Sequence, residues 1–398
     1  MSQTPRGFQG RSTYIDGLRG LAALAVACYH IDRYGPLPIA AMPVIPGWLM
    51  AAIDHGSIGV QVFFVISGFV IAYSVRSARV TPWYVGNYAL RRSIRLDPPY
   101  WATIAFVLIL HAVMHLHLGF DSPLDVPSKL EPALSWHLIA SHVLYLQNIL
   151  AYFQGRLGYT QYENLSAGFW TLCIEVQFYL LYVVGQGIAQ RFPHRERRDP
   201  AEASPLGLLA VFAPLALLSL FEWNRTFHGH AVYDNDMWII RFFSMFFLGA
   251  SAWWALDGRI PRAVFWLYVA AFAGRIIQQA IHERWSDDLV IGLSAAFLTG
   301  ISIYGAGRLG KLGTWLNYRP LQYLGTISYS LYLIHFPMSH VVTTMGSNLL
   351  GESPSPGAAT AVLVAALAVS LLAAHVLYTF VEAPSVRLAA RFKRPEKA

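Results

Sequence analysis

The chain has 398 residues, of which 55% are hydrophobic, 14% aromatic and only 13% charged. Soluble proteins carry about 25% charged residues, so this composition excludes a disordered chain and argues against an ordinary cytosolic enzyme. The net charge is +7, but the basic residues are spaced between long apolar stretches, which argues against a nucleic-acid partner. The two cysteines, Cys28 and Cys173, lie in apolar runs and exclude a disulfide scaffold. The composition therefore indicates a polytopic membrane protein.

Ten mostly apolar stretches are long enough to cross the ~30 Å hydrocarbon core of a bilayer as helices. The first holds Asp16 and Arg19 within its apolar run and is followed by no small-residue cleavage site, so we interpret it as a retained helix rather than a signal peptide. We expect an all-α fold with transmembrane helices at 14–33, 59–75, 101–118, 169–190, 205–221, 238–256, 263–281, 289–306, 321–342 and 358–382.

The distribution of Lys and Arg indicates the orientation, because cytoplasmic loops are enriched in both. With the N-terminus inside, the inner segments hold 21 of the 29 Lys and Arg residues and the outer segments hold 5. This alternation through ten spans predicts that both termini are cytoplasmic. We expect one transmembrane domain over residues 1–385 and a basic cytoplasmic tail over residues 386–398.

One predicted outer connection, residues 119–168, is unusually long for a compact domain. Its stretch Leu134–Phe153 is apolar and aromatic but carries polar side chains such as His142 and Asn148. We interpret it as an interfacial or re-entrant helix, because an eleventh full span would break the charge alternation.

Ionisable groups inside a membrane are costly and are functional candidates by default. The first predicted helix carries Asp16, Arg19 and His30. Arg19 and His30 are eleven residues apart, which in an α-helix places them within roughly 20° of one face, and Asp16 lies one turn before Arg19 and can pair with it. An ion pair anchoring the helix end, and a histidine hydrogen-bonded at the outer interface, are the structural alternatives. A cation and an imidazole on one face suit a long anionic cofactor entering from the cytoplasm, with the imidazole as proton acceptor.

Three arginines, Arg91, Arg92 and Arg95, follow the second span in the segment RRSIRLDPPYW. We expect the pair Pro98–Pro99 to stop this segment at the membrane. Ordinary positive-inside charge explains the arginines equally well. The other interpretation is a phosphate-binding site, because a planar guanidinium makes two parallel hydrogen bonds to a phosphate.

Trp170 and Glu175 lie near the expected outer end of the fourth span, in FWTLCIEVQFYL. A buried glutamate there can orient an imidazole, bind a sugar hydroxyl or neutralise an arginine. The pair Ser67–Gly68 in the second span is small enough for close helix packing, which we take as its role.

The ninth span contains ISYSLYLIHFP, in which Tyr329, Tyr332 and His335 are spaced three residues apart. They form one polar face, although membrane-interface aromatic residues are the alternative for the tyrosines. Glu382 and Pro384 are expected to stop the last span.

Two patterns resemble metal sites but do not support one. His111, His115 and His117 approach the expected outer interface without a nearby carboxylate, and the D-x-D pair Asp234 and Asp236 lies in an outer loop. We therefore expect no metal.

An ordered set of motifs along the chain resembles acyltransferase family 3, integral membrane proteins that move acyl groups onto extracytoplasmic sugars and related acceptors. The resemblance covers nearly the whole chain. Two departures are noted: the C-terminal hydrolase-like domain of some members is not expected here, and Asp97 stands where an apolar residue or tyrosine is usual. The motifs are IDGLRGLAALAVACYH, GVQVFFVISGFVI, RRSIRLDPPYW, FWTLCIEVQFYLLY, SYSLYLIHFP and FVEAP.

The resemblance implies roles for these residues. The family's arginine–ten residues–histidine motif matches Arg19 and His30, its arginine-rich motif matches the three second-loop arginines, and its tryptophan–glutamate motif matches Trp170 and Glu175. It implies an acyl-CoA donor, most simply acetyl-CoA, a carbohydrate-type acceptor, membrane lipids around the chain and a bacterial inner-membrane location. The expected catalytic residues are His30 and Glu175, the donor-binding residues are Arg19, Arg91, Arg92 and Arg95, and the substrate-binding residues are Asp16, Trp170, Tyr332 and His335.

In this scheme His30 acts as general base on the acceptor hydroxyl or carries the acyl group transiently, and the sequence leaves both routes open. A transporter or flippase of a lipid-linked saccharide is the main alternative, although such proteins usually show broken helices in paired repeats. A sensory or scaffolding membrane protein would explain the topology but not the shared face of Arg19 and His30.

Overall fold

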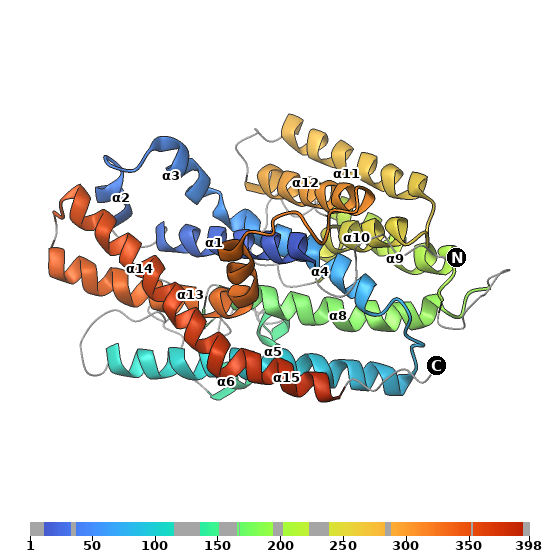
Figure 1. Cartoon of the computed structure of the whole chain (residues 1–398), viewed down its shortest axis with the longest axis horizontal. Coiled ribbons are helices and arrows are strands. Elements are labelled where there is room, and N and C mark those ends of the chain that lie inside the picture. Colours follow the sequence, from blue (N-terminus) through green and yellow to red (C-terminus); the bar gives the residue numbers. More distant parts are fainter. Residues whose placement is uncertain are drawn as a thin grey trace. The chain divides into compact units, whose positions relative to one another are not determined.

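The computed structural model describes residues 12–32, 37–114, 136–150, 165–166, 168–193, 202–222, 239–282, 288–351 and 353–392. All regular structure within these ranges is helical (Figure 1). The all-α prediction is therefore confirmed for the part of the chain that is described. The predicted candidates His115, His117, Asp234 and Asp236 lie outside it.

Each of the ten predicted spans overlaps a long helix. These helices are α1 (Thr13–Asp32), α4 (Gly59–Ser74), α5 (Pro82–Val113), α8 (Phe169–Ala189), α9 (Pro205–Glu222), α10 (Ile239–Leu256), α11 (Arg262–His282), α12 (Asp288–Arg308), α13 (Arg319–Leu350) and α14 (Pro356–Leu377). Within the described ranges, seven helices are long and apolar enough to cross a membrane, and α1, α9 and α13 are not among them. A multi-pass membrane protein is thus supported, and the count of ten spans stays a prediction.

The chain folds as two compact units, each assembled from separate stretches of sequence. Unit 1 comprises residues 1–19, 58–88 and 173–323. Unit 2 comprises residues 20–57, 89–172 and 324–398. The predicted transmembrane domain over 1–385 and basic tail over 386–398 stay a prediction.

Helix α10 forms the centre of unit 1. Its residues from Phe242 to Ala255 are all buried, and it contacts α4, α9, α11 and α12 (Figure 1). Aromatic rings also pack against α10, for example Phe178 of α8 stacked on Phe246 with ring centroids 3.9 Å apart. Stacked rings of this kind add to the free energy gained from burying apolar surface.

Two glycines allow α4 and α10 to pack backbone against backbone. A Cβ atom at Gly68 would lie 1.9 Å from the carbonyl oxygen of Phe246, and one at Gly249 would lie 1.9 Å from that of Val65. No side chain fits at either position. The predicted packing role of Gly68 is confirmed, and this contact is typical of helix association in membranes, where small residues let backbones approach.

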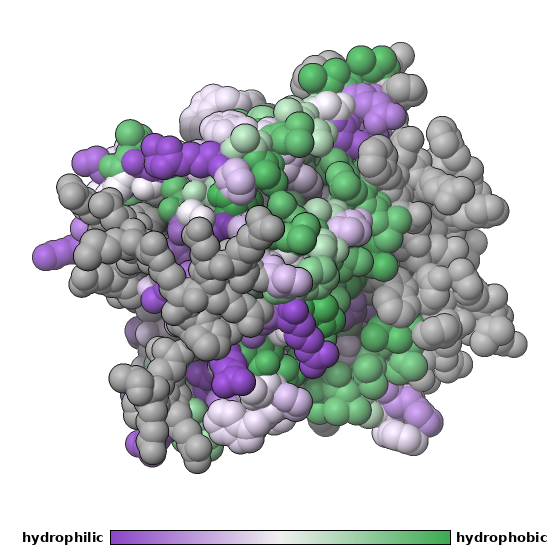
Figure 2. All heavy atoms as spheres, turned by 90° about the vertical axis from the view of Figure 1, so that its right-hand side faces the viewer, coloured by the Kyte–Doolittle hydropathy of each residue, from purple (hydrophilic) through white to green (hydrophobic). Residues whose placement is uncertain are grey.

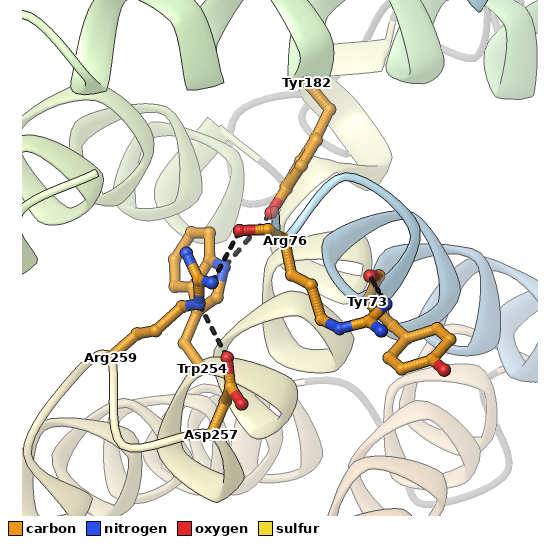
Figure 3. Close-up of polar contacts among 6 residues, drawn as sticks. All are labelled: Tyr73, Arg76, Tyr182, Trp254, Asp257 and Arg259. Atoms are coloured by element: carbon orange, nitrogen blue, oxygen red, sulfur yellow. Dashed lines mark hydrogen bonds and ion pairs between the residues drawn. The ribbon is translucent and has the colours of Figure 1, made fainter. Parts of the chain in front are cut away.

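Polar contacts join the segment after α4 to the segment after α10 in unit 1 (Figure 3). The guanidinium of Arg259 bonds the carboxylate of Asp257 at 2.7 Å and donates to the carbonyl oxygen of Arg76 at 2.6 Å. Nearby, the indole N–H of Trp254 donates to the hydroxyl of Tyr182 at 3.1 Å. Arg259 comes from a segment predicted to be cytoplasmic, so at least one of the basic residues counted there also stabilises the fold.

Unit 2 contains the short helices α2 (Leu37–Ala41), α3 (Gly47–Asp54), η1 (Gly56–Ile58), of which Ile58 belongs to unit 1, α6 (Trp136–Val143), η3 (Tyr378–Glu382) and α15 (Ala383–Arg391) in addition to parts of the long ones. Helix α2 packs against α14 (Figure 1) through the buried residues Leu37, Ala41 and Ala359. Helix α6 begins at Trp136 inside the predicted interfacial stretch, so that stretch is helical over part of its length.

Two predicted helix stops are wrong. Helix α5 runs unbroken through Pro98 and Pro99, because a membrane helix tolerates proline where neighbouring groups satisfy the freed carbonyls. The last span does not end at Glu382 either, since a π-helical turn leads directly into α15. The carboxylate of Glu382 instead accepts hydrogen bonds from the backbone N–H and hydroxyl of Ser330, at 3.2 and 2.6 Å, and so ties two helices together.

Large apolar side chains are exposed on many helices, among them Leu267, Ile281 and Leu298 at 64–76% exposure. On the face drawn in Figure 2, hydrophobic residues cover continuous areas beside hydrophilic ones. Such exposure is unfavourable in water but expected where lipid tails replace it.

Candidate functional site

His30 and His335, which are 305 residues apart in the sequence, meet in unit 2. Nε2 of His335 lies 3.1 Å from Nδ1 of His30, and the ring centroids are 5.0 Å apart. His30 is in the last turn of α1 and His335 lies midway along α13. The sequence predicts a catalytic role for His30 and a substrate-binding role for His335, and the structure brings the two rings into contact.

The two imidazoles have different surroundings. His335 is fully buried, and the hydroxyl of Ser370 donates to its backbone carbonyl at 3.3 Å, which connects it to α14. His30 is half-buried, with its ring edge-on to Tyr29 and Phe336. Of the pair, His30 is therefore the imidazole that a substrate can reach, and His335 supports it from inside the unit.

Tyr332 extends this site along α13 towards the start of α8. Its ring centroid lies 5.9 Å from that of His335, and its hydroxyl lies 2.7 Å from the hydroxyl of Thr171. Thr171 itself donates to the carbonyl of Gly168 at 2.9 Å, so the tyrosine must be the donor of the bond between them. Trp170 is adjacent to Thr171, and the predicted substrate residues Trp170, Tyr332 and His335 are thus gathered within unit 2.

The segment 136–150 holds the first turn of α8 in place. The side-chain amides of Gln147 and Asn148 donate to the carbonyl oxygens of Phe169 and Trp170, at 3.3 and 2.9 Å. The backbone N–H of Leu165 donates to Nε2 of the buried His142 at 3.1 Å. The predicted interfacial segment therefore packs against the first turn of α8, which contains Trp170.

His142 is kept neutral by its surroundings. Burial lowers its pKa to about 4, against the opposing effect of its hydrogen bond to the carbonyl of Leu138. Since a backbone N–H can only donate, Nε2 must carry a lone pair and Nδ1 the proton.

The three second-loop arginines lie half-buried on α5 in unit 2 rather than in a loop. Arg91 and Arg95 are four residues apart and share a helix face. The hydroxyl of Tyr329 donates to the carbonyl of Leu96 at 2.8 Å, which places this part of α5 beside α13. The arginines are therefore on an ordered helix that also packs against the helix carrying His335.

Asp97, the residue that departs from the family pattern, has a structural role. Its carboxylate accepts hydrogen bonds from the hydroxyls of Ser93 and Tyr145. Tyr145 also stacks on Tyr100, with ring centroids 4.8 Å apart. Asp97 thus connects α5 to the segment after α6. This role is visible only in the tertiary contacts.

The remaining predicted residues, Asp16, Arg19 and Glu175, belong to unit 1. Asp16 and Arg19 are half-buried on α1. The carboxylate of Glu175 accepts hydrogen bonds from the hydroxyls of Ser67, at 2.9 Å, and Tyr179. Ser67 was assigned to packing alone, and its bond to Glu175 is a contact that sequence reasoning missed.

Two further contacts of the site were not predicted. The sequence does not reveal the pairing of His30 with His335, because it shows each histidine on its own helix and not which helices lie side by side. Thr171 gave no sequence signal, since one threonine in an apolar run is ordinary. Among the described residues, no group of three or more His, Cys, Asp or Glu side chains could hold a metal ion.

Comparison with known proteins gives a match over most of the chain. A family model described as an acyltransferase domain matches residues 12–375, a range that includes every predicted site residue. No solved structure matches the chain significantly.

Similar curated proteins come from several bacteria. BcsY of Komagataeibacter xylinus, named as a membrane-bound transacylase, is 28% identical over 83% of this chain and 73% of its own length. The acyltransferase MdmB of Streptomyces mycarofaciens is 27% identical over 96% of this chain and 93% of its own length. The peptidoglycan O-acetyltransferase OatA of Listeria monocytogenes is 25% identical over 96% of this chain, which spans 57% of that protein.

Proposed function

Because the chain belongs to acyltransferase family 3, we propose that it moves an acyl group, most simply acetyl, from cytoplasmic acyl-CoA to a hydroxyl of an extracytoplasmic carbohydrate. Membership of the family and the names of its relatives support an O-acyltransferase in a membrane. The donor, the direction of transfer and the acceptor are the content of the proposal. We place the protein in a bacterial inner membrane with both termini and the basic tail in the cytoplasm.

The observation that carries the proposal is the half-buried imidazole of His30 in contact with a second, buried imidazole. Transfer to a hydroxyl needs a base that removes its proton as the oxygen attacks the acyl carbon. Histidine is the side chain best suited to this near neutral pH, and a base is typically oriented by a second group. His30 is that base in this proposal, with transient acylation of its ring as the second route.

The donor would bind along α5. Arg91, Arg92 and Arg95 can hold the phosphates of acyl-CoA, because guanidinium groups make charge-assisted, two-pronged hydrogen bonds to phosphate. Arg19, on the same helix α1 as His30, is also assigned to the donor, as the family motif implies.

The acceptor would approach His30 from the outer side. Tyr332, Trp170 and His335 are assigned to this side because they gather near the start of α8. An indole suits stacking on a sugar ring, and the relatives named for peptidoglycan acetylation support a carbohydrate acceptor. Glu175 and Asp16 are proposed to position the reacting groups.

The test is acyl-CoA turnover by the purified protein in nanodiscs, with a panel of acyl chain lengths and free thiol as the readout. We expect CoA release by the wild type, at least slowly as hydrolysis without acceptor, and its loss by a factor of about 10²–10⁴ in His30→Gln, the usual contribution of a general base. His375→Gln is the control, because His375 is an exposed histidine on α14. A fully active His30→Gln protein would sink the proposal.

The same assay tests the donor site. Each of Arg91→Gln, Arg92→Gln and Arg95→Gln should raise the KM for acyl-CoA by a factor of about 10–150, because a hydrogen bond to a charged group contributes about 1.5–3 kcal/mol. Arg262→Gln, an exposed arginine at the start of α11, should leave this KM unchanged. If acyl-CoA neither binds nor is turned over by the intact wild type, a saccharide transporter becomes the better interpretation.

A further inference from the structure

We propose that His335 is a positioning residue: it accepts a hydrogen bond from Nδ1 of His30 and so keeps Nε2 of His30 as the basic nitrogen. This inference rests on the proposed function, since it concerns the base of that reaction. It follows from three polar contacts of the two rings, all within unit 2.

The proton of His335 is located by its own helix. Nδ1 of His335 lies 3.0 Å from the carbonyl oxygen of Leu331, one helical turn earlier. A carbonyl oxygen can only accept, so Nδ1 carries the proton. In the neutral ring Nε2 then carries a lone pair, and this is the atom that lies 3.1 Å from Nδ1 of His30.

The proton of His30 is located in the same way. Its Nδ1 lies 2.9 Å from the carbonyl oxygen of Val26 and faces the lone pair of His335. With the proton on Nδ1, both neighbours accept from it. With the proton on Nε2 instead, the lone pair of Nδ1 would face the Val26 oxygen, and a His335 that donated to it would have to carry a charge in a fully buried position.

His142 supports this reasoning at a separate place in unit 2. It also directs Nδ1 at the carbonyl four residues earlier, that of Leu138 at 2.9 Å. Its Nε2 accepts from the backbone N–H of Leu165, a group that can only donate. At His142, where an independent donor identifies the tautomer, the proton is thus on Nδ1, as we infer for His335.

The arrangement gives His335 a defined part in catalysis. As the acceptor oxygen forms its bond to the acyl carbon, its proton passes to Nε2 of His30. The thioester carbon–sulfur bond then breaks, and the sulfur leaves as the CoA thiol with that same proton. During the step His30 is an imidazolium, and its Nδ1–H is held by His335 and Val26, so a neutral imidazole performs the orienting role that a carboxylate has in a serine-protease triad.

Two substitutions separate this role from packing. In His335→Gln the amide oxygen can take the place of Nε2 and accept from His30. In His335→Asn the shorter side chain can still donate to Leu331 but ends before it reaches His30. Both replacements are polar and of similar size, so a general effect on folding should be shared by them.

We expect kcat to fall at least about tenfold in His335→Asn, a part of the ~10²–10⁴-fold effect of a general base, with the KM for acyl-CoA within about twofold of wild type. His335→Gln should keep kcat within about threefold of wild type. Equal loss in both variants, or full activity in both, would overturn the proposal.

A spectroscopic measurement on the wild type needs no variant at position 335. In protein labelled with ¹⁵N-histidine, the signals of His30 are those that disappear in His30→Gln, and the nitrogen shifts distinguish a protonated from an unprotonated ring nitrogen. We expect a proton on Nδ1 in the wild type and in His335→Gln, and a mixture in His335→Asn. A proton on Nε2 in the wild type would refute the positioning role even if His30→Gln is inactive. A fully active His30→Gln would instead refute the proposed function and leave the pairing of the rings measurable.

Discussion

The ring orientation of three histidines is fixed by a hydrogen bond to the backbone of the helix that carries them. His30, His142 and His335 each direct Nδ1 at the carbonyl oxygen four residues earlier, belonging to Val26, Leu138 and Leu331. A ring held in this way presents Nε2 away from its own helix. What Nε2 then meets differs: a backbone N–H for His142, a second imidazole for His335. The same local geometry thus serves structure in one place and, in our proposal, chemistry in another.

Stability should fall in mild acid because of His142, which lies outside the predicted spans. Its folded pKa of about 4 is below the ordinary value of 6.5, so the unfolded chain binds the proton more tightly. The contribution of the neutral His142 to the free energy of unfolding is therefore complete above pH 6.5 and is lost as the pH falls towards 4. Between pH 7 and pH 5 this one group should cost about 2 kcal/mol.

Thermal unfolding of the purified protein at these two pH values measures the effect. His142→Gln should reduce the loss at pH 5, because glutamine can still accept from Leu165 but does not titrate. His137→Gln, at an exposed neighbouring position, should behave as the wild type does. An unchanged pH dependence in His142→Gln would show that other groups cause it.

Among the elements, the pair α4 and α10 decides how unit 1 is packed. Gly68 and Gly249 face the backbone of the opposite helix, at positions where a Cβ atom would lie 1.9 Å from a carbonyl oxygen. The contact also brings Ser67, one residue away, to a helix junction where it donates to Glu175. The close packing of α4 on α10 at Gly68 therefore lies directly beside the hydrogen bond that holds the carboxylate of Glu175.

Gly68→Ala and Gly249→Ala should each destabilise the protein by about 1–3 kcal/mol, the cost of overpacking a filled interior. Gly274→Ala in α11 and Gly305→Ala in α12 are matched controls, since a Cβ atom at either position meets nothing within 4 Å. The controls should be neutral or gain about 0.5–1 kcal/mol, because alanine loses less backbone entropy than glycine in a helix. Melting temperatures in one detergent give the comparison, and equal values for all four variants would contradict it.

The position of the arginine-rich motif on helix α5 changes how its side chains can bind a phosphate. The sequence predicts a connection with at most a short helix that Pro98 and Pro99 end, but the arginines lie on a continuous helix of 32 residues. Their side chains therefore have fixed angular relations, with Arg91 and Arg95 on one face. A phosphate site on such a helix is preorganised, whereas a loop would have to be ordered when the donor binds.

For the whole molecule, the alternation of Lys and Arg predicts which connections face the cytoplasm. Ser353, in the connection before α14, is expected outside, while Arg79 and Arg387 are expected inside. With Cys28 and Cys173 replaced by alanine, Ser353→Cys should react with a membrane-impermeant maleimide on intact spheroplasts. Arg79→Cys and Arg387→Cys should react only after the membrane is opened. Labelling of Arg387→Cys from outside would overturn the predicted position of the C-terminus.

The ten long helices of the described residues and the family motifs could be predicted from the sequence alone, whereas short helices such as α2, α3 and α15 were not predicted. Apolar stretches of sufficient length overlap all ten long helices, because helix formation in a membrane depends on local hydropathy and on bonds within one segment. The candidates His30, Tyr332 and His335 were also found this way, since a polar side chain in an apolar run is conspicuous wherever it finally lies.

Only the tertiary structure decided which of these side chains meet. The contact of His30 with His335, the bonds of Glu382 to Ser330 and the bond of Thr171 to Tyr332 join residues 52 to 305 positions apart. Such contacts depend on how each helix is rotated and on which helix lies beside it, and both follow from packing against the rest of the fold. The continuity of α5 through Pro98 and Pro99 is likewise seen only in the structure, because a proline predicts a helix stop unless groups outside the helix compensate for the hydrogen bonds that it removes.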